Sequence, residues 1–205
     1  QVSALSADQI NSLEAAQVQA LDATDVAGLS LSTLQSLHVD ELSAAQLGKL
    51  SSLQLKSLST AQLSTLTSSQ APGLSVKSLT VLSPTQLRSI SSDAISGLTT
   101  NQVSTLSIDT ISTLNTEQLK GLSTSQVQAL TPMQVKALSS TQINSLTTTQ
   151  FQSIDASEIA GLNINTFKAF TTTQVAALSD SQVEALSQTQ VKALTTTQLH
   201  ELSST

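Results

Sequence analysis

Hydrophobic and polar residues follow an eight-residue pattern along almost the whole chain. The pattern is clearest over residues 171–202, which read TTTQVAAL, SDSQVEAL, SQTQVKAL and TTTQLHEL. From Ser43 to Leu202 the same pattern runs through twenty octapeptides without a gap. We number the positions of each octapeptide one to eight, so that the closing leucine is position eight.

Three positions of the octapeptide carry the signals of a helix start. Position one is Ser, Thr, Asn or Asp in all twenty, and position four is Gln in fifteen and Glu in one, at Glu158. Ser/Thr-x-x-Gln/Glu is the capping box, in which each side chain accepts a hydrogen bond from the other residue's backbone N–H. The hydrophobic residue at position five and the preceding closing leucine form the hydrophobic staple. Each octapeptide therefore predicts one short helix.

A single long helix does not fit this pattern. Eight residues at about 100° each leave successive octapeptides roughly 80° out of phase, so no continuous apolar stripe forms. Helices of about five or six residues are too short to be stable alone in water. Units of fixed period that bury their apolar faces on one another form a solenoid. The sequence therefore predicts an all-α solenoid of very short capped helices.

The number of octapeptides in one coil follows less directly from the sequence. Proline at the first helical position and phenylalanine at position five each recur only in alternate octapeptides, at Pro84 and Pro132 and at Phe151 and Phe167. This alternation predicts two octapeptides per 16-residue coil. Glycines at position seven instead recur every 24 residues, at positions 73, 97 and 121, which keeps three octapeptides per coil open.

A β-solenoid is the competing interpretation, because Ser, Thr, Val and Gln also occur in β-coils. On a strand, positions five and eight would face opposite sides, since they are an odd number of residues apart. Leu, Ala and Gln favour helix. The helical interpretation is preferred on these grounds.

The pattern divides the chain into three parts. Residues 1–37 form a first repeat segment, and residues 38–42 (HVDEL) form a five-residue unit at which the register slips by three. Residues 43–205 are the regular array, for which we expect one continuous rod. Because a regular coil cannot absorb three missing residues, we expect a kink or altered stacking at the slip.

Composition narrows the function classes. The chain has 205 residues and no cysteine, so it has no disulfide and no thiolate chemistry. Its net charge of −6 argues against nucleic-acid binding, and all of that excess lies in residues 1–48, which hold six acidic residues and no Lys or Arg. No apolar run approaches the length of a membrane span.

Candidate chemistry is sparse. His38, Asp40 and Glu41 are the one tight cluster of a histidine with acids, and no further residues are indicated that would complete a metal site. The serines and threonines are explained as helix caps, and no partner base activates any of them as a nucleophile. We expect no catalytic residues, no cofactor and no metal, and therefore not an enzyme.

Two surfaces are candidates for binding. Phe151, Phe167 and Phe170 are the only aromatic residues and lie close together in sequence, so they are candidate partner-binding anchors, although aromatics at core positions more often serve packing. Small residues at position six of one helix series would give a flat face for a second rod, a protein or a glycan.

The octapeptide resembles a repeat found in a known class of proteins. The run TTTQVAALSDSQVEALSQTQVKALTTTQL, residues 171–199, follows a Leu-[Ser/Thr]-x-x-Gln-[Val/Ile/Leu]-x-Ala-Leu pattern. It resembles the octapeptide arrays of very large, repetitive secreted or surface proteins of bacteria, which are often labelled adhesin-like or haem-utilisation-like. The resemblance covers nearly the whole chain, implies an extracellular or cell-surface setting, and brings no catalytic residues with it.

Two functional hypotheses follow. The first is a structural region, such as a stalk, a spacer or a self-assembling fibre segment, and the second is a solenoid scaffold that binds a protein or a glycan. Residues 1–5 are the back half of an octapeptide and Ser203 begins another. We therefore expect the partners to be further repeats of the same chain, or other copies that stack end to end or laterally.

Overall fold

The computed structural model describes residues 6–202, and within that range it contains helices and no strand. The predicted all-α solenoid of short helices is confirmed, and the β-solenoid alternative is wrong. The α-helices are five to seven residues long and the 3₁₀ helices three, so none among the described residues could cross a membrane.

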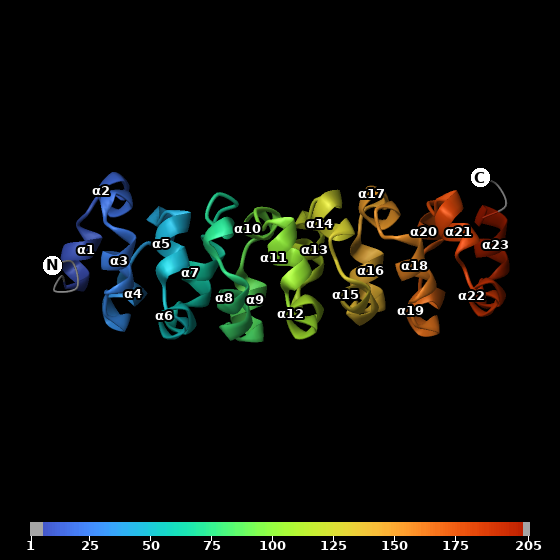
Figure 1. The fold of residues 1–205 in the computed structure, drawn as a ribbon, viewed down its shortest axis with the longest axis horizontal. Coiled ribbons are helices and arrows are strands. Elements are labelled where there is room, and N and C mark those ends of the chain that lie inside the picture. The colour runs from blue at the N-terminus through green and yellow to red at the C-terminus, as the bar shows by residue number, and fades with distance from the viewer. Residues whose placement is uncertain (1–5, 203–205) are drawn as a thin grey trace. The chain divides into compact units, whose positions relative to one another are not determined.

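The chain divides into two compact segments, which we describe separately (Figure 1). The N-terminal segment, Gln1–Leu106, contains α1 (Ala7–Asn11), α2 (Ala15–Ala20), α3 (Ala23–Ala27), α4 (Leu31–Ser36), the 3₁₀ helix η2 (Val39–Glu41), α5 (Ala44–Lys49), α6 (Ser52–Ser57), α7 (Thr60–Ser64), the 3₁₀ helix η3 (Ala71–Gly73), α8 (Val76–Val81), α9 (Pro84–Ser89), α10 (Ser92–Ser96) and α11 (Thr100–Thr105).

The C-terminal segment, Ser107–Thr205, contains twelve helices among its described residues. They are α12 (Ile108–Thr113), α13 (Thr116–Gly121), α14 (Thr124–Gln128), α15 (Pro132–Ala137), α16 (Ser140–Ser145), α17 (Thr148–Gln152), α18 (Ala156–Ala160), α19 (Ile164–Lys168), α20 (Thr172–Ala176), α21 (Asp180–Glu184), α22 (Gln188–Ala193) and α23 (Thr196–Leu202).

Helix α16 shows how a regular octapeptide begins and ends. Before α16, Ser139 has extended backbone angles, its Oγ accepts from the N–H of Gln142 at 3.2 Å, and its own N–H donates to Gln142 Oε1 at 2.8 Å. The helix closes when the N–H of Leu146 donates to the carbonyl of Ile143, three residues back, at 3.2 Å. Leu146 is itself extended, with φ −63° and ψ 140°, so the chain turns there toward the next cap.

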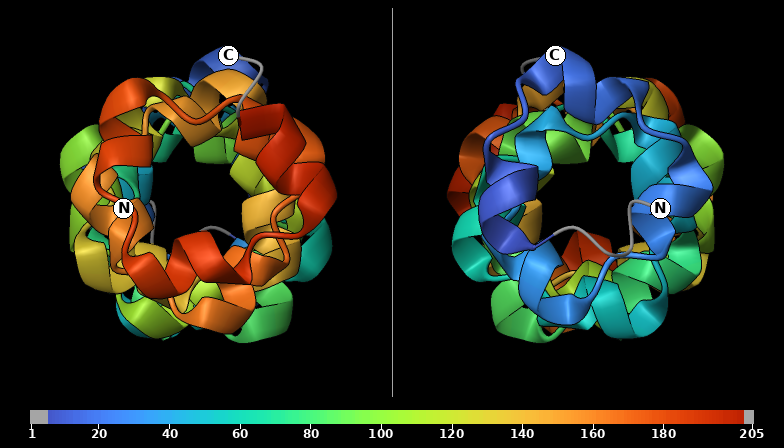
Figure 2. Two further views of the ribbon diagram at one scale, coloured as in Figure 1. Left: turned by 90° about the vertical axis from the view of Figure 1, so that its right-hand side faces the viewer. Right: turned by 90° about the vertical axis from the view of Figure 1, so that its left-hand side faces the viewer.

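Positions five and eight form the core. In α16 the position-five residue Ile143 is fully buried, and Leu146 at position eight is 6 % exposed. The octapeptides follow one another around a ring, which Figure 2 shows for the last helices of the C-terminal segment in its left view and for the first helices of the N-terminal segment in its right view. Each fully buried leucine, valine or isoleucine stabilises the fold by about 1.5–3 kcal/mol.

The coil is longer than the sequence alternation predicts. In the C-terminal segment α13 packs against α16, and α16 packs against α19, so the nearest neighbour along the solenoid is the third octapeptide onward (Figure 1). Side-chain bonds described below reach the fourth octapeptide back. One turn therefore takes between three and four octapeptides, and the prediction of two octapeptides per 16-residue coil is wrong.

The 24-residue spacing of the glycines indicated the length of the coil better than the alternation of proline and phenylalanine did. A Cβ built on Gly73 would lie 2.0 Å from the carbonyl oxygen of Ala44 in the previous turn, and one on Gly97 would lie 2.0 Å from that of Ser68. Glycine is therefore required where the backbones of adjacent turns approach most closely. Helices three octapeptides apart pack against each other, and three octapeptides are the 24 residues that separate these glycines. Pro84 and Pro132 are exposed, so packing between turns does not constrain their spacing.

The five-residue unit does not disturb the stacking. Val39 and Leu42 are buried like any residues at positions five and eight, with exposed fractions of 1 % and 2 %. The Gln70 side chain reaches both of their carbonyls, as other glutamines do in regular octapeptides. The three missing residues come from the first turn of the helix, so the expected alteration of stacking at residues 38–42 is wrong.

Candidate functional site

The glutamine at position four joins adjacent turns of the solenoid. While Oε1 of Gln142 closes its own capping box, its Nε2 donates to the carbonyls of Leu114 at 2.9 Å and Ile111 at 3.2 Å, which are 28 and 31 residues earlier. The Leu114 carbonyl lies just past the end of α12, where a helix leaves its last C=O groups without an intrahelical partner, and the Ile111 carbonyl also accepts the Leu114 N–H at 3.2 Å. One side chain thus caps the start of its own helix and the end of a helix in the preceding turn.

The same contact recurs in both segments. Position-four amides donate to a position-eight carbonyl at 2.5–3.0 Å, and the donors and acceptors are Gln46 and Leu21, Gln54 and Leu29, Gln62 and Leu37, Gln70 and Leu42, Gln86 and Leu58, Gln150 and Leu122, Gln182 and Ile154, and Gln198 and Phe170. Most of these glutamines are buried, down to 1 % exposed at Gln46. A buried polar group without a partner costs about 1–3 kcal/mol, so each bond removes that cost from both turns.

A second amide contact runs in the other direction. The position-six side chain of Asn144 donates through Nδ2 to the carbonyl of Ala169 at 2.8 Å, and that of Gln152 donates through Nε2 to Ala177 at 3.0 Å, each 25 residues onward. Gln35 makes the same bond to Ser57, but across 22 residues. The difference of three equals the residues lost at the slip, which confirms that the short unit counts as a full octapeptide in the stacking.

Glu158 is the one carboxylate at a position-four site. It accepts the N–H of Asp155 at 3.3 Å and completes a capping box, and it is only 4 % exposed. Burial raises the pKa of the Glu158 carboxyl, and the nearby Asp155 charge acts in the same direction, while the Asp155 N–H opposes both. The 28- and 31-residue register pairs Glu158 with the carbonyls of Leu130 and Val127, to which an ionised carboxylate can donate no hydrogen bond.

The three phenylalanines lie in the core. Phe151 and Phe167 are fully buried and Phe170 is 3 % exposed. The Phe170 ring lies 5.0 Å from each of the other two ring centroids, edge-on to Phe151 at 88° and tilted by 49° to Phe167. These are packing geometries that aromatic pairs favour. The candidate anchors therefore stabilise the stacking of the C-terminal segment and offer no exposed ring to a partner.

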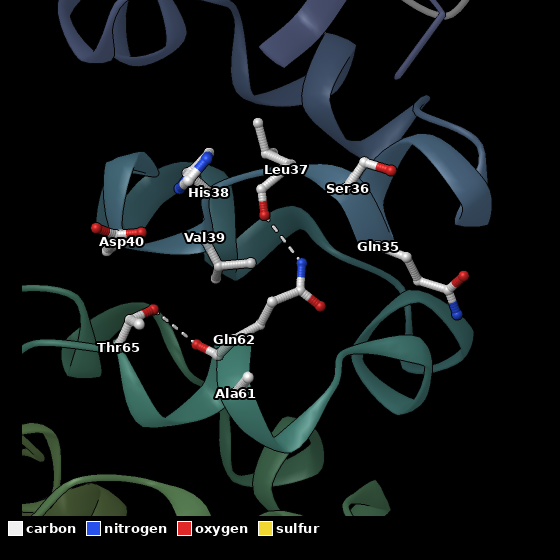
Figure 3. A pocket seen from close by; sticks show the side chains of 9 residues that line it. All are labelled: Gln35, Ser36, Leu37, His38, Val39, Asp40, Ala61, Gln62 and Thr65. Atoms are coloured by element: carbon white, nitrogen blue, oxygen red, sulfur yellow. Dashed lines mark hydrogen bonds between the residues drawn. The ribbon is translucent and has the colours of Figure 1, made fainter. Parts of the chain in front are cut away.

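A pocket lies at the five-residue unit. It has a volume of about 250 Å³, opens to solvent, and is lined by the end of α4, by η2 and by α7 (Figure 3). His38 and Asp40 are exposed lining residues, whereas the side chains of Leu37 and Val39 are buried in the core. Within residues 6–202 no group of three or more His, Cys, Asp or Glu side chains is placed to hold a metal ion.

Lysines line two shallow grooves of the C-terminal segment. One groove lies between α13 and α16 and includes Lys120, which forms an ion pair with Glu117 at 3.0 Å. The other lies between α19 and α22 and includes Lys168 and Lys192. Lys168 and Lys192 line the same groove because α19 and α22 belong to octapeptides three apart, which pack against each other; the 16-residue coil did not predict this.

Sequence reasoning missed the second bond of the position-four glutamine. The signal was present, because both Gln and Glu satisfy a capping box but only Gln carries a donor, and fifteen of the sixteen such residues in the twenty octapeptides are Gln. A capping box alone does not explain why Gln is preferred to Glu. A second partner that needs a hydrogen-bond donor explains the preference.

Comparison with known proteins supports a repeat region. The ALTTAQ repeat family matches the chain twice, at residues 109–140 and 165–196, both within the C-terminal segment. Each match covers four octapeptides, which is about the length of one turn. No curated protein matches the sequence.

Proposed function

We propose that this chain is a non-enzymatic structural repeat region of an extracellular bacterial protein, serving as a stalk, a spacer or a self-assembling fibre segment. The observation that carries the proposal is the recurring bond from position-four glutamines to the preceding turn. The donor is the position-four glutamine and the acceptor is a backbone carbonyl of an earlier octapeptide, so the contact needs nothing beyond the repeat itself. A chain built this way can be lengthened by adding octapeptides without redesigning any contact.

The positions of the octapeptide that recur are those with structural roles, which supports a structural function for the chain. Positions one, four, five and eight supply the cap, the bridging amide and the core. Positions two, three and six are mostly exposed and vary in chemistry, as Gln188, Thr189 and Lys192 do in α22. The residues that recur are those that hold the solenoid together, and the exposed side chains of residues 6–202 vary from one octapeptide to the next.

An extracellular setting is supported by the resemblance to arrays of secreted and surface proteins. It is also supported by the absence of cysteine from the sequence, since such a chain has no thiol to oxidise outside the cell. Fractionation of the source cells with an antibody against this region would test the location. Recovery only from the cytosol would overturn the extracellular part of the proposal.

Self-association is supported by the last turn of the C-terminal segment. Val175 at position five is fully buried, whereas Val191 and Leu199 at the same position are 40 % and 41 % exposed. In the interior, the following turn covers such side chains. A further octapeptide array, in the same chain or in a second copy, would cover them in the same way, and contacts of this heterologous kind can propagate.

Sedimentation velocity across a concentration series tests the fibre role. We expect the chain to form larger species as concentration rises, and we expect Val191→Asp with Leu199→Asp to abolish them. Met133→Asp is the matched control, because Met133 is 60 % exposed but lies in the interior helix α15. A monomer at every concentration would remove self-assembly and leave a stalk or spacer.

An adhesion module is the second candidate function. It is favoured by one observation, the pocket at residues 35–40, because this is where the array departs from its own pattern while keeping its stacking.

A further inference from the structure

Each joint between adjacent turns has a donor side and an acceptor side. Gln174 donates to the carbonyl of Ile143 and Gln182 donates to that of Ile154, both at 2.8 Å, and in each bond the amide belongs to the later turn. The position-four bonds therefore run in one direction along the solenoid. A turn with no earlier neighbour keeps its donors free, and a turn with no later neighbour keeps its acceptors free.

The first turn of the N-terminal segment carries two free donors. Oε1 of Gln9 and Oε1 of Gln17 accept the N–H of their own cap residues at 2.9 and 2.8 Å, so both glutamines close their capping boxes. Among the described residues neither Nε2 makes a hydrogen bond, and both side chains are exposed. Gln46, which has an earlier turn beside it, is 1 % exposed and donates to that turn at 2.9 Å.

The last turn of the C-terminal segment carries matching acceptors. The carbonyls of Leu186 and Leu194 accept no hydrogen bond among the described residues, whereas the position-eight carbonyl of Phe170, which has a later turn beside it, accepts one at 2.8 Å. The position-five side chains that follow these two carbonyls, Val191 and Leu199, are 40 % and 41 % exposed. The last turn thus offers unpaired carbonyls and apolar side chains together.

The interior shows which helix each bond covers. Gln198 donates to the carbonyl of Phe170, and its helix α23 packs against α20, the helix that follows Phe170. Val175 of α20 is fully buried. A glutamine bonded to a position-eight carbonyl therefore places its own helix over the helix that follows that carbonyl. In the last turn these helices are α22, after Leu186, and α23, after Leu194.

We propose that the first turn of a second copy of this chain binds on the last turn as one interior turn binds on another. The amide of Gln9 donates to the carbonyl of Leu186, which places α1 over α22. The amide of Gln17 donates to the carbonyl of Leu194, which places α2 over α23, since both pairs are eight residues apart. This inference rests on the self-association proposed above and specifies its contact.

The contact has a fixed polarity. Two first turns placed face to face would oppose donors to donors, and two last turns would oppose acceptors to acceptors. Only a head-to-tail arrangement, first turn on last turn, pairs the two sets. It leaves one free face of each kind at the ends of every assembly, so it can propagate beyond a dimer.

Removing the two donors tests the contact. Gln9→Glu with Gln17→Glu keeps the oxygen that closes each capping box and removes both Nε2 donors. By sedimentation velocity of the full chain, we expect the concentration needed for association to rise roughly 30-fold, as for the loss of two ordinary hydrogen bonds. Gln19→Glu with Gln128→Glu is the matched control, because it makes the same charge change at exposed position-six side chains, and it should associate like the wild type. If the double variant loses its helical circular dichroism spectrum, each single variant is measured instead, with an expected rise of about fivefold.

A mixing experiment tests the polarity. The Gln9→Glu, Gln17→Glu chain keeps a competent last turn, and the Val191→Asp, Leu199→Asp chain keeps a competent first turn. We expect each variant alone to be monomeric at concentrations where the wild type associates. The equimolar mixture should form complexes of two chains and no larger, because each complex has no further competent face.

The results that contradict the contact differ from those that contradict self-association as such. If the Gln9→Glu, Gln17→Glu chain associates like the wild type while the Val191→Asp, Leu199→Asp chain does not, the last turn binds a different surface and the inference is overturned. Monomers in the mixture, under conditions where the wild type associates, overturn it equally. A wild-type chain that is monomeric at every concentration overturns this contact together with the self-association on which it rests.

Discussion

The Nε2 of Gln142 lies 2.9 Å from the carbonyl oxygen of Leu114, 28 residues earlier in the chain. The bond joins the start of one helix to the end of another in the preceding turn, and both ends are satisfied by one side chain. Equivalent bonds recur from Gln46 to Gln198. We therefore regard position four as the residue that sets the register between turns.

Gln142→Glu should destabilise the C-terminal segment although it preserves the capping box. The carboxylate can still accept the Ser139 N–H, but it cannot donate to Leu114 and would be buried beside carbonyl oxygens. We expect a loss of about 1–3 kcal/mol in the free energy of unfolding at pH 7, measured by urea denaturation. Gln128→Glu, at an exposed position six, is the control, and a loss as large there would contradict the role given to position four.

Glu158→Gln should have the opposite effect. The new amide supplies the donor that the register offers to Leu130 and Val127, and it removes a buried carboxyl whose pKa is raised by desolvation. We expect the variant to be more stable than the wild type by about 1 kcal/mol at pH 7. Equal stability of the two proteins at pH 7 would argue that Glu158 already has a partner in solution.

The same residue predicts a pH dependence. Because its pKa in the folded state is raised above the ordinary value of 4.5, the folded protein binds the proton more tightly than the unfolded chain does. The stability this contributes is fully present below pH 4.5 and is lost as pH rises through the folded-state pKa. The difference in unfolding free energy between Glu158→Gln and wild type should therefore shrink as pH falls from 7 to 4.

Ser123→Ala should cost about 1 kcal/mol, since Ser123 Oγ accepts the Gln126 N–H at 3.2 Å at the start of α14. Ser125→Ala is the matched control two residues away, where the side chain is exposed and makes no side-chain hydrogen bond among the described residues. Thermal unfolding of the two variants measures the difference. Identical midpoints would mean that the cap is dispensable once the turns have stacked.

Gly73→Ala should be among the most damaging single changes. Its Cβ would lie 2.0 Å from the Ala44 carbonyl oxygen, and the obstacle is backbone, which cannot rotate away. Gly48→Ala tests the same pair of turns, but there the nearest atom, the Gly73 carbonyl oxygen, is 3.2 Å from the new Cβ. We expect Gly73→Ala to lower the unfolding midpoint far more than Gly48→Ala, and a reversed order would contradict the close approach of the two turns.

The sequence was informative wherever a residue acts within its own octapeptide. Ser139 and Gln142 form a predicted cap, and Ile143 and Leu146 form a predicted core pair, because helix capping and the staple are local. The coil length depends on contacts between distant octapeptides. Of the residues that indicated two octapeptides per coil, Pro84 and Pro132 are exposed. Phe151 and Phe167 are buried at position five, which is a core position of the octapeptide, so neither pair shows which octapeptides are neighbours.

The candidate site was less predictable from the sequence for the same reason. Phe151, Phe167 and Phe170 stand out by composition, but they occupy positions five and eight and are buried there. His38 and Asp40 stand beside a pocket only because the missing residues belong to the first turn and Val39 keeps its place in the core. That outcome depends on how adjacent turns hold the shortened unit, which a single octapeptide pattern cannot specify.

The register of the turns is tested most directly by NMR contacts of the Gln142 side-chain amide. Its two Nε2 protons can be assigned as the pair that disappears in Gln142→Glu. We predict nuclear Overhauser effects from these protons to Leu114 and Ile111, together with slow exchange with water. Effects instead to residues 123–130, as a 16-residue coil would require, or rapid exchange with solvent, would contradict the account.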